Sequence, residues 1–427
     1  MTTPNLSRRG ATAPSSPIRR LTPYADAAKA RGVVVHHLNI GQPDLHTVSP
    51  MRAAYARFAD EVIAYSPSEG YLYYRKALAA YYNQLTGDAP PIDPSQILVT
   101  VGGSEALLFT IAAACDPGDE ILVAEPYYTN YAGFSHMLGV GVVPVATHAS
   151  ESFAIPPDRV RAAITPRTRA FVVPSPGNPT GMVLSADDLR ALGRVCQDAN
   201  IFFVVDEVYR EFVYPEPPVP ADSPIPTALA GALDGALALA PSVLAIPELA
   251  AHAVVIDSVS KRYSACGARV GCLVTRNPDF YAACLKFAQA RLSPPTVDQF
   301  AAAAALTTPQ PEMRAMIDAY RARRDLIVAG LNQIPGVSCP TPTGAFYLVT
   351  ELPVADAEDF CIFMLRDFNL AGETVMMAPA EGFYATPGAG RHQVRIAYVL
   401  APDKLTRCLE ILRAGLSAYA QRTNSAA

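Results

Sequence analysis

A lysine placed among hydroxyl and guanidinium groups is the most informative feature of this 427-residue chain. Lys261 follows Ser258 and Ser260 at alternate positions, and Arg269 comes eight residues later. A lysine amine can form an imine with an aldehyde, while hydroxyls and an arginine can hold a phosphate on the same molecule. The run therefore predicts a site for a phosphorylated aldehyde. A surface lysine in a strand-to-loop turn is the alternative that the run alone leaves open.

The elements that would position this lysine alternate between strand-like and helix-like segments. We expect strands at residues 97–101, 120–124, 170–173, 201–206 and 253–256, and helices at 69–85, 104–114 and 185–200. Such alternation predicts an α/β fold with a mostly parallel sheet and helices on both faces. Ligands of such sheets bind at the carboxyl ends of the strands.

The C-terminal third is expected to form a smaller α+β domain. It is helical from residue 296 to about 334, then gives a strand at 345–349, a helix near 355–368, a strand at 393–398 and a last helix near 402–419. Between the strands at 201–206 and 253–256, a proline-rich stretch and an Ala/Leu-rich stretch suggest an insertion of one or two short helices over 214–252.

Three further motifs place groups that would suit the same ligand. Gly103 and Ser104 join a strand to a helix, where free N–H groups and the helix dipole favour an anion. Asp206 ends a very apolar strand and needs a partner. Arg395 lies inside another apolar strand, and its guanidinium suits a carboxylate or a phosphate. A helix cap for Asp206 and an internal salt bridge for Arg395 remain the structural alternatives.

These motifs, with others in the same order over about residues 35–420, resemble the fold-type I pyridoxal-phosphate-dependent aminotransferases of class I/II, the aspartate aminotransferase-like group. The other matching runs are residues 38–44, with Gln42 in place of the family's glutamate, and residues 65–70, 126–130, 175–181 and 206–209. The resemblance implies a large domain with a mostly parallel sheet, a smaller α+β domain and pyridoxal 5'-phosphate (PLP) as the cofactor.

The resemblance also implies a role for each matching residue. Lys261 would hold PLP as an internal aldimine and later transfer a proton at the substrate's Cα. Asp206 would meet the pyridine nitrogen, Tyr209 and Asn178 the phenolic oxygen, and Tyr128 the ring face. The phosphate contacts would be Gly103, Ser104, Ser258, Ser260, Arg269 and, across a dimer, Tyr65. The substrate contacts would be Gly41, Asn178, Arg395 for the α-carboxylate and Arg291 for a second carboxylate.

The resulting hypothesis is a homodimeric PLP-dependent transaminase (EC 2.6.1.-) that exchanges an L-amino acid and a 2-oxo acid by a ping-pong reaction. An aspartate- or glutamate-type substrate is the best match, with Arg262 and Arg75 as other candidate cations because the spacing around Arg291 departs from the family. Aromatic, branched-chain or alanine-type substrates remain open, as does a PLP-dependent lyase, oxidase or cyclase. A non-enzymatic effector domain of a transcription regulator would need a basic domain ahead of the matched region, where only about 35 residues stand.

The composition limits the binding partners and the cellular compartment that we expect for this protein. The net charge of -5 argues against nucleic-acid binding, and the eight scattered cysteines indicate neither a disulfide framework nor a metal site. The lack of a disulfide framework fits a reducing cytosol, so we predict a cytoplasmic protein. No membrane span is expected. The first 25 residues lack acids, but their prolines argue against a transit-peptide helix. We divide the chain into a partly disordered N-terminal arm that crosses the partner (1–34), a segment joining the small domain (35–60), a large PLP-binding domain (61–300) and a small domain (301–427).

Overall fold

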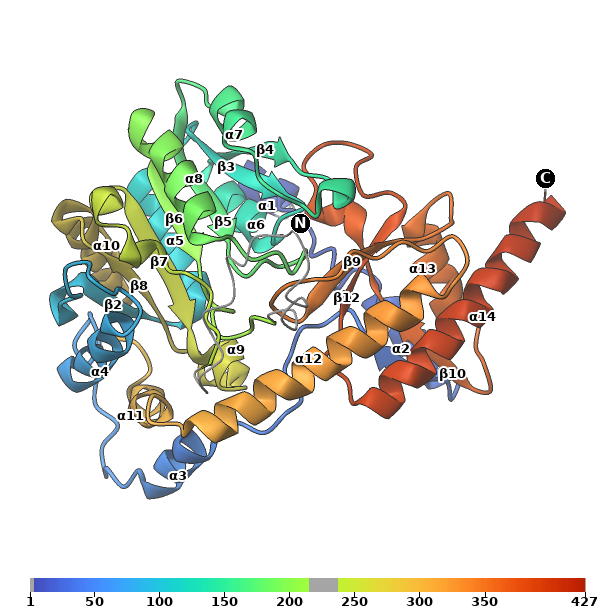
Figure 1. The fold of residues 1–427 in the computed structure, drawn as a ribbon, viewed down its shortest axis with the longest axis horizontal. Helices are drawn as coiled ribbons and strands as arrows, with labels where there is room; N and C mark the ends of the chain where they lie inside the picture. The colour runs from blue at the N-terminus through green and yellow to red at the C-terminus, as the bar shows by residue number, and fades with distance from the viewer. Residues whose placement is uncertain (1–3, 215–236, 427) are drawn as a thin grey trace, which may run out of the picture.

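A seven-stranded sheet forms the centre of the larger part of the computed structural model, which describes residues 4–214 and 237–426 (Figure 1). In sheet order the strands are β2 (Ile97–Thr100), β8 (Gly271–Thr275), β7 (Ala253–Ser258), β6 (Phe202–Asp206), β5 (Thr168–Pro174), β3 (Glu120–Glu125) and β4 (Gly141–Ala146). β8 is antiparallel to β2 and to β7, and all other neighbours are parallel. The predicted α/β fold with a mostly parallel sheet is confirmed.

Helices cover both faces of this sheet because successive side chains of its buried strands point to opposite faces. In β6, Val204 packs into one core, while Phe203 and Val205 pack into the other. The first core lies under α5 (Gly102–Ala114), α6 (Asn130–Leu138) and α10 (Pro278–Arg291). The second lies under α4 (Leu72–Asn83) and α8 (Ala186–Asp198), and α7 (Pro157–Ala163) contacts α8.

One edge of the sheet gathers the functional candidates. Because β2, β3, β5, β6 and β7 all run in the same direction, their carboxyl ends meet at this edge. The segments that leave these ends carry, in turn, Gly103, Tyr128, Asn178, Asp206 and Lys261. Residues separated by more than 150 positions in the sequence are thereby brought to one place.

The smaller part of the molecule follows the long helix α12 (Gln310–Asn332), which leads away from the large sheet in Figure 1. Its antiparallel sheet has the order β11 (Ala378–Pro379), β12 (Gln393–Ala397) and β9 (Tyr347–Glu351). β1 (Val34–His37) pairs in parallel with β10 (Glu373–Met376). The helices around these strands are α2 (Thr22–Ala30), α13 (Ala357–Arg366) and α14 (Pro402–Ala426). The proposed division into four segments stays a prediction.

Several local predictions need correction. The helical region expected from residue 296 to about 334 is two helices, α11 (Thr296–Ala305) and α12, because Pro309 stands at the N-terminal boundary of the second. β4, β8, α6 and α10 were not predicted. Of the expected insertion, residues 215–236 lie outside the described residues. Residues 237–252 contain two short 3-10 helices, Val243–Ala245 and Pro247–Leu249, in keeping with the expected short helices.

The remaining elements connect these parts. α1 (Arg8–Thr12) contacts α6 of its own chain, where the Arg9 guanidinium donates to Met137 O at 3.0 Å. α3 (Ser49–Arg57) packs on α11, and α9 (Val259–Arg262) follows β7. Within the described residues, none of the helices combines the length and the apolar character needed to cross a bilayer.

Candidate active site

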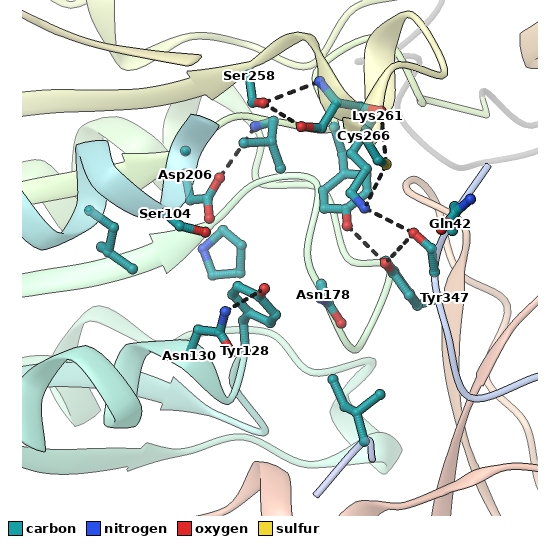
Figure 2. Close-up of a pocket in the computed structure, with 18 of the residues that line it drawn as sticks. Gln42, Ser104, Tyr128, Asn130, Asn178, Asp206, Ser258, Lys261, Cys266 and Tyr347 are labelled. Carbon is teal, nitrogen blue, oxygen red and sulfur yellow. Dashed lines mark hydrogen bonds between the residues drawn. The ribbon is translucent and has the colours of Figure 1, made fainter. Parts of the chain in front are cut away.

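A cavity of about 340 Å³ lies at the carboxyl ends of the sheet strands (Figure 2). The predicted site residues that line it are Gly41, Gly103, Ser104, Tyr128, Asn178, Asp206, Tyr209, Ser258, Ser260, Lys261, Arg269 and Arg395. Figure 2 shows Lys261 and Tyr347 on one side of it and Asp206 and Tyr128 on the other, with Asn178 between them. The cavity is therefore built from segments of both sheets.

Lys261 is presented to the cavity by an abrupt change from strand to helix. β7 ends at Ser258, whose side chain accepts a hydrogen bond from the backbone N–H of Ser260 and so caps the single turn of α9. The Lys261 amine donates to the backbone oxygen of Gly41 at 2.9 Å and lies 3.6 Å from the thiol sulfur of Cys266. The amine thus extends from the end of β7 toward Gly41, which lies in the segment between Val34–His37 (β1) and Ser49–Arg57 (α3).

The hydroxyls and the guanidinium predicted to bind a phosphate lie together beside the start of α5. The Ser258 and Ser260 hydroxyl oxygens are 2.8 Å apart. The Arg269 guanidinium lies so close to Gly102 that a Cβ there would be 2.4 Å from one of its nitrogens, and Gly102 has φ +74°. Glycine suits this position, because a side chain would be strained at this φ and would displace the Arg269 guanidinium. The N–H groups of the first turn of α5 complete an anion-binding arrangement.

Asp206 supplies the buried acid of the cavity. Its Oδ2 accepts a hydrogen bond from the Tyr131 hydroxyl at 2.9 Å, and Val208 N lies 3.4 Å from Oδ1. Burial raises the pKa of the Asp206 carboxyl to about 6, and these hydrogen bonds only partly oppose the effect. A cationic group placed beside Asp206 would lower this pKa and stabilise the ionised carboxylate.

A pair of tyrosines joins the two sheets next to the lysine. The Tyr209 and Tyr347 hydroxyl oxygens are 2.9 Å apart, and the Tyr347 hydroxyl lies 3.4 Å from Gly41 O. A Cβ at Gly41 would overlap the Tyr347 hydroxyl at 1.7 Å, so this close approach requires glycine. On the other side of the cavity, Tyr128 accepts a hydrogen bond from the Asn130 amide at 2.8 Å. Burial raises the pKa of Tyr128 to about 12, which keeps its hydroxyl protonated.

Arg395 projects from β12 as a buried cation that forms no ion pair with an acid among the described residues. Its guanidinium donates to the backbone oxygen of Asn39 and lies 3.4 Å from Asn178 Oδ1, while its buried Nε has no hydrogen-bond partner among the described residues. It also lies 4.7 Å from the Tyr347 ring centroid. Burial lowers the pKa of the Arg395 guanidinium from its usual range. A carboxylate ligand would supply the charge that the protein does not provide.

Two predicted site residues do not line this cavity. The Tyr65 side chain is 79% exposed in the single chain. Arg291 lies beside Glu105, with 3.4 Å between Nε and the carboxylate, and donates to the backbone oxygens of Ser68 and Val99. The assignment of Arg291 to a substrate carboxylate therefore has no support from the cavity of its own chain.

The two alternative cations for a second substrate carboxylate have partners within their own chain. Arg262 is buried and forms ion pairs with Asp257 and Glu211. Arg75 donates to the backbone oxygens of Gly70 and Pro94. Both guanidinium groups are held outside the cavity lining.

Several lining residues were missed by the sequence analysis. Tyr131 contacts Asp206, Tyr347 contacts Tyr209, and Arg19 enters from the segment between α1 and α2. Tyrosines are frequent in this chain, and neither of these two stands in a distinctive motif. Arg19 lies in a region that sequence analysis assigned to a partly disordered arm, so only the tertiary structure reveals its position.

The fold and this cavity together define a PLP-dependent transferase of fold type I. The family model "Aminotransferase class I and II" matches residues 34–412. An aspartate aminotransferase from Geobacillus stearothermophilus is 31% identical over 426 residues, which cover 97% of this chain and 100% of that protein. The chain belongs to the class I and II aminotransferase family, whose members use PLP.

Solved structures agree with this assignment. The Thermus thermophilus aspartate aminotransferase with maleate matches with a TM-score of 0.82 and 30% identity, over 97% of this chain and 100% of that one. An alanine aminotransferase from Pyrococcus furiosus matches with a TM-score of 0.84 and 28% identity over the same shares. The relatives thus share the fold and the reaction class but differ in the substrate that their names give.

Proposed function

We propose that this aminotransferase binds PLP through Lys261 and transfers the amino group of an aspartate- or glutamate-type L-amino acid to a 2-oxo acid. The observation that carries the proposal is the convergence on one cavity of Asp206 from β6, Arg395 from β12 and Lys261 from α9. Bound PLP would supply an aldehyde and an electron-withdrawing ring that stabilises negative charge at the substrate's Cα.

The residues of the cavity fit this cofactor. The cofactor phosphate would be held by Ser258, Ser260, Arg269 and the start of α5. The close approach of the Arg269 guanidinium to Gly102, the first residue of α5, favours this assignment. Asp206 would meet the ring nitrogen, because burial raises its pKa to about 6 and no ion pair links it to a basic side chain among the described residues. Tyr209 and Asn178 would contact the phenolic oxygen, and Tyr128 would flank the ring.

Different residues of the chain would bind the substrate and transfer its proton. Arg395, with Gly41 and Asn178 beside it, would bind the α-carboxylate and fix the direction of the Cα–H bond. Lys261 would carry the proton between Cα and the cofactor carbon, as general base and then as general acid. Its contact with Gly41 O and the nearby tyrosine pair would keep the amine on the side of the cavity where this transfer occurs.

We further propose a homodimer with shared sites, in which Tyr65 reaches the partner's phosphate site. Large apolar side chains are exposed on neighbouring segments around Tyr65: Val62, Ile63, Leu72, Tyr73, Leu292 and Phe300. These segments contact each other, since Thr296 Oγ1 donates to Ala64 O at 2.7 Å. An apolar patch of this kind favours an interface with another protein chain. The prediction that residues 1–34 cross the partner stays open, although α1 contacts α6 of its own chain.

A single-turnover absorbance screen with individual amino acids tests the reaction. We expect aspartate or glutamate to convert the bound cofactor to its amine form in one turnover, and a 2-oxo acid to restore the starting spectrum. Aromatic, branched-chain and alanine-type amino acids should react more slowly. Continuous turnover of an amino acid without a 2-oxo acid would instead indicate a lyase, an oxidase or a cyclase, and a chain that shows no reaction would contradict the proposal.

A further inference from the structure

The cavity contains one more cation than the proposed reaction has assigned. Among the described residues that line it, the positive side chains are Lys261, Arg269, Arg395 and Arg19, and the acid is Asp206. Lys261 is assigned to the cofactor aldehyde, Arg269 to the phosphate and Arg395 to the α-carboxylate. Arg19 is left without a role, although a cation at a substrate cavity attracts anionic ligands.

Arg19 is free to bind a ligand. Its side chain is exposed, and no hydrogen bond or ion pair links its guanidinium to the part of the chain that the structure describes. It nonetheless lines the cavity together with Tyr128, and its charge opposes the rise in the pKa of Tyr128. Its neighbour Arg20 forms an ion pair with Glu358. Arg20 therefore has an acidic partner, whereas Arg19 has none among the described residues.

The backbone that carries Arg19 is tied to the residue proposed to bind the α-carboxylate. The Asn39 side chain donates to Ile18 O at 2.9 Å, and the Asn39 backbone oxygen accepts a hydrogen bond from Arg395. One residue therefore fixes both the segment of Arg19 and the guanidinium of Arg395. Both arginines line the same cavity, and their backbone segments are joined through Asn39.

We propose that Arg19 binds the side-chain carboxylate of a dicarboxylic amino acid and thereby sets the preference for acidic over neutral substrates. The inference rests on the proposed function and assigns Arg19 the role that the sequence analysis gave to Arg291. A guanidinium can bind a carboxylate through two parallel N–H groups, which a neutral side chain cannot use.

The test compares two arginine variants of the complete holoenzyme. Arg19→Ala removes the proposed contact, and Arg8→Ala removes the same charge from an exposed position in α1 outside the cavity lining. Single-turnover kcat/KM is measured with L-aspartate, L-glutamate and L-alanine. We expect Arg19→Ala to lower the values for the two acidic substrates by roughly 10- to 100-fold, the usual effect of losing a charged hydrogen bond. The alanine value should change less than about twofold, and Arg8→Ala should resemble wild type throughout.

A binding measurement gives a second readout that does not depend on turnover. Maleate and propionate are titrated into each holoenzyme and followed by the cofactor absorbance. Arg19→Ala should weaken maleate by a factor similar to that for aspartate and leave propionate unchanged, while Arg19→Lys should recover part of the maleate affinity because it keeps the charge.

The outcomes separate this inference from the proposed function. If wild type reacts with amino acids but Arg19→Ala lowers aspartate and alanine equally, Arg19 does not select acidic substrates. Wild type that prefers neutral amino acids overturns the inference and leaves transamination intact. If wild type converts no amino acid at all, the proposed function itself fails.

Discussion

Replacing Asp206 with asparagine should stabilise the cofactor-free protein while damaging the enzyme. Burial raises the pKa of this carboxyl from 3.8 to about 6. Because the folded-state pKa is the higher one, the protonated carboxyl contributes stability that is fully present below pH 3.8 and lost as the pH rises through about 6. Asparagine does not titrate, and its amide oxygen can still accept the hydrogen bond from Tyr131.

The size of the effect follows from these two pKa values. Relative to a group that does not titrate, Asp206 should destabilise the cofactor-free fold by about 1.6 kcal/mol at pH 5 and about 3 kcal/mol at pH 8. Equilibrium urea unfolding of both proteins at the two pH values measures the difference. We expect Asp206→Asn to be more stable at both, with a gap that widens by about 1.4 kcal/mol between pH 5 and pH 8. The change in the stability difference between pH 5 and pH 8 is the more reliable quantity. Any effect of the substitution on packing is the same at both pH values and therefore cancels.

Turnover should change in the opposite direction. With the cofactor bound, a neutral amide can no longer stabilise a cationic ring nitrogen, so proton abstraction from Cα should slow by roughly 100-fold or more while substrate binding changes little. The matched control is Asp257→Asn on the next strand, which leaves Arg210 and Arg262 without their shared carboxylate and should destabilise the fold. A stability gap for Asp206→Asn that stays constant with pH, or a rate within about twofold of wild type, would refute the assignment.

Four further substitutions test the remaining parts of the site. Borohydride reduction should fix the chromophore at Lys261, which peptide mapping can locate, and Lys261→Ala should bind the cofactor without a covalent link and lose nearly all turnover. Mixing Lys261→Ala and Tyr65→Phe dimers should restore activity by subunit exchange, because one mixed site carries both changes and the other carries neither; no recovery would contradict shared sites. Arg395→Ala should weaken every amino acid alike, by roughly a few kcal/mol in kcat/KM. Arg291→Ala, by removing the cation beside Glu105, should lower the melting temperature without changing the preference between aspartate and alanine, and a selective loss of aspartate would show a substrate contact instead.

The sequence predicted those parts of the site that lie in runs of distinctive composition. Lys261 and its two serines follow an apolar strand, and Asp206 ends another. In both places the change from strand to turn can be recognised from the neighbouring residues in the sequence. Their convergence followed from the rule that parallel strands present their carboxyl ends at one edge. The same reasoning predicted Arg395, because a charge within an apolar strand needs a ligand.

The rest of the site depends on contacts between distant segments. Tyr131 and Tyr347 meet their partners across 75 and 138 residues of sequence. The position of Arg19 depends on the hydrogen bond from Asn39 to the preceding residue, and that of Arg291 on its approach to Glu105. No local pattern encodes either contact. Position along the chain was therefore a poor guide to which arginine faces the cavity.

Two aspartates at neighbouring strand ends show how the fold separates a structural acid from a functional one. In the sequence, Asp206 and Asp257 look alike, since each follows three or more apolar residues near the end of a buried strand. Asp257 accepts hydrogen bonds from Arg210, Arg262 and Tyr82, and its pKa is lowered although burial opposes this. It anchors the turn that presents Lys261.

Asp206 has no such cationic partner in the part of the chain that the structure describes, and burial raises its pKa to about 6. The unpaired acid costs the cofactor-free fold stability, whereas the paired one does not. An acid that the fold leaves uncompensated, facing a cavity beside a lysine, is positioned to meet a cation from outside the chain. The ring nitrogen of the proposed cofactor meets that requirement, and the contrast in pKa between the two aspartates is the physical reason to assign the role to Asp206.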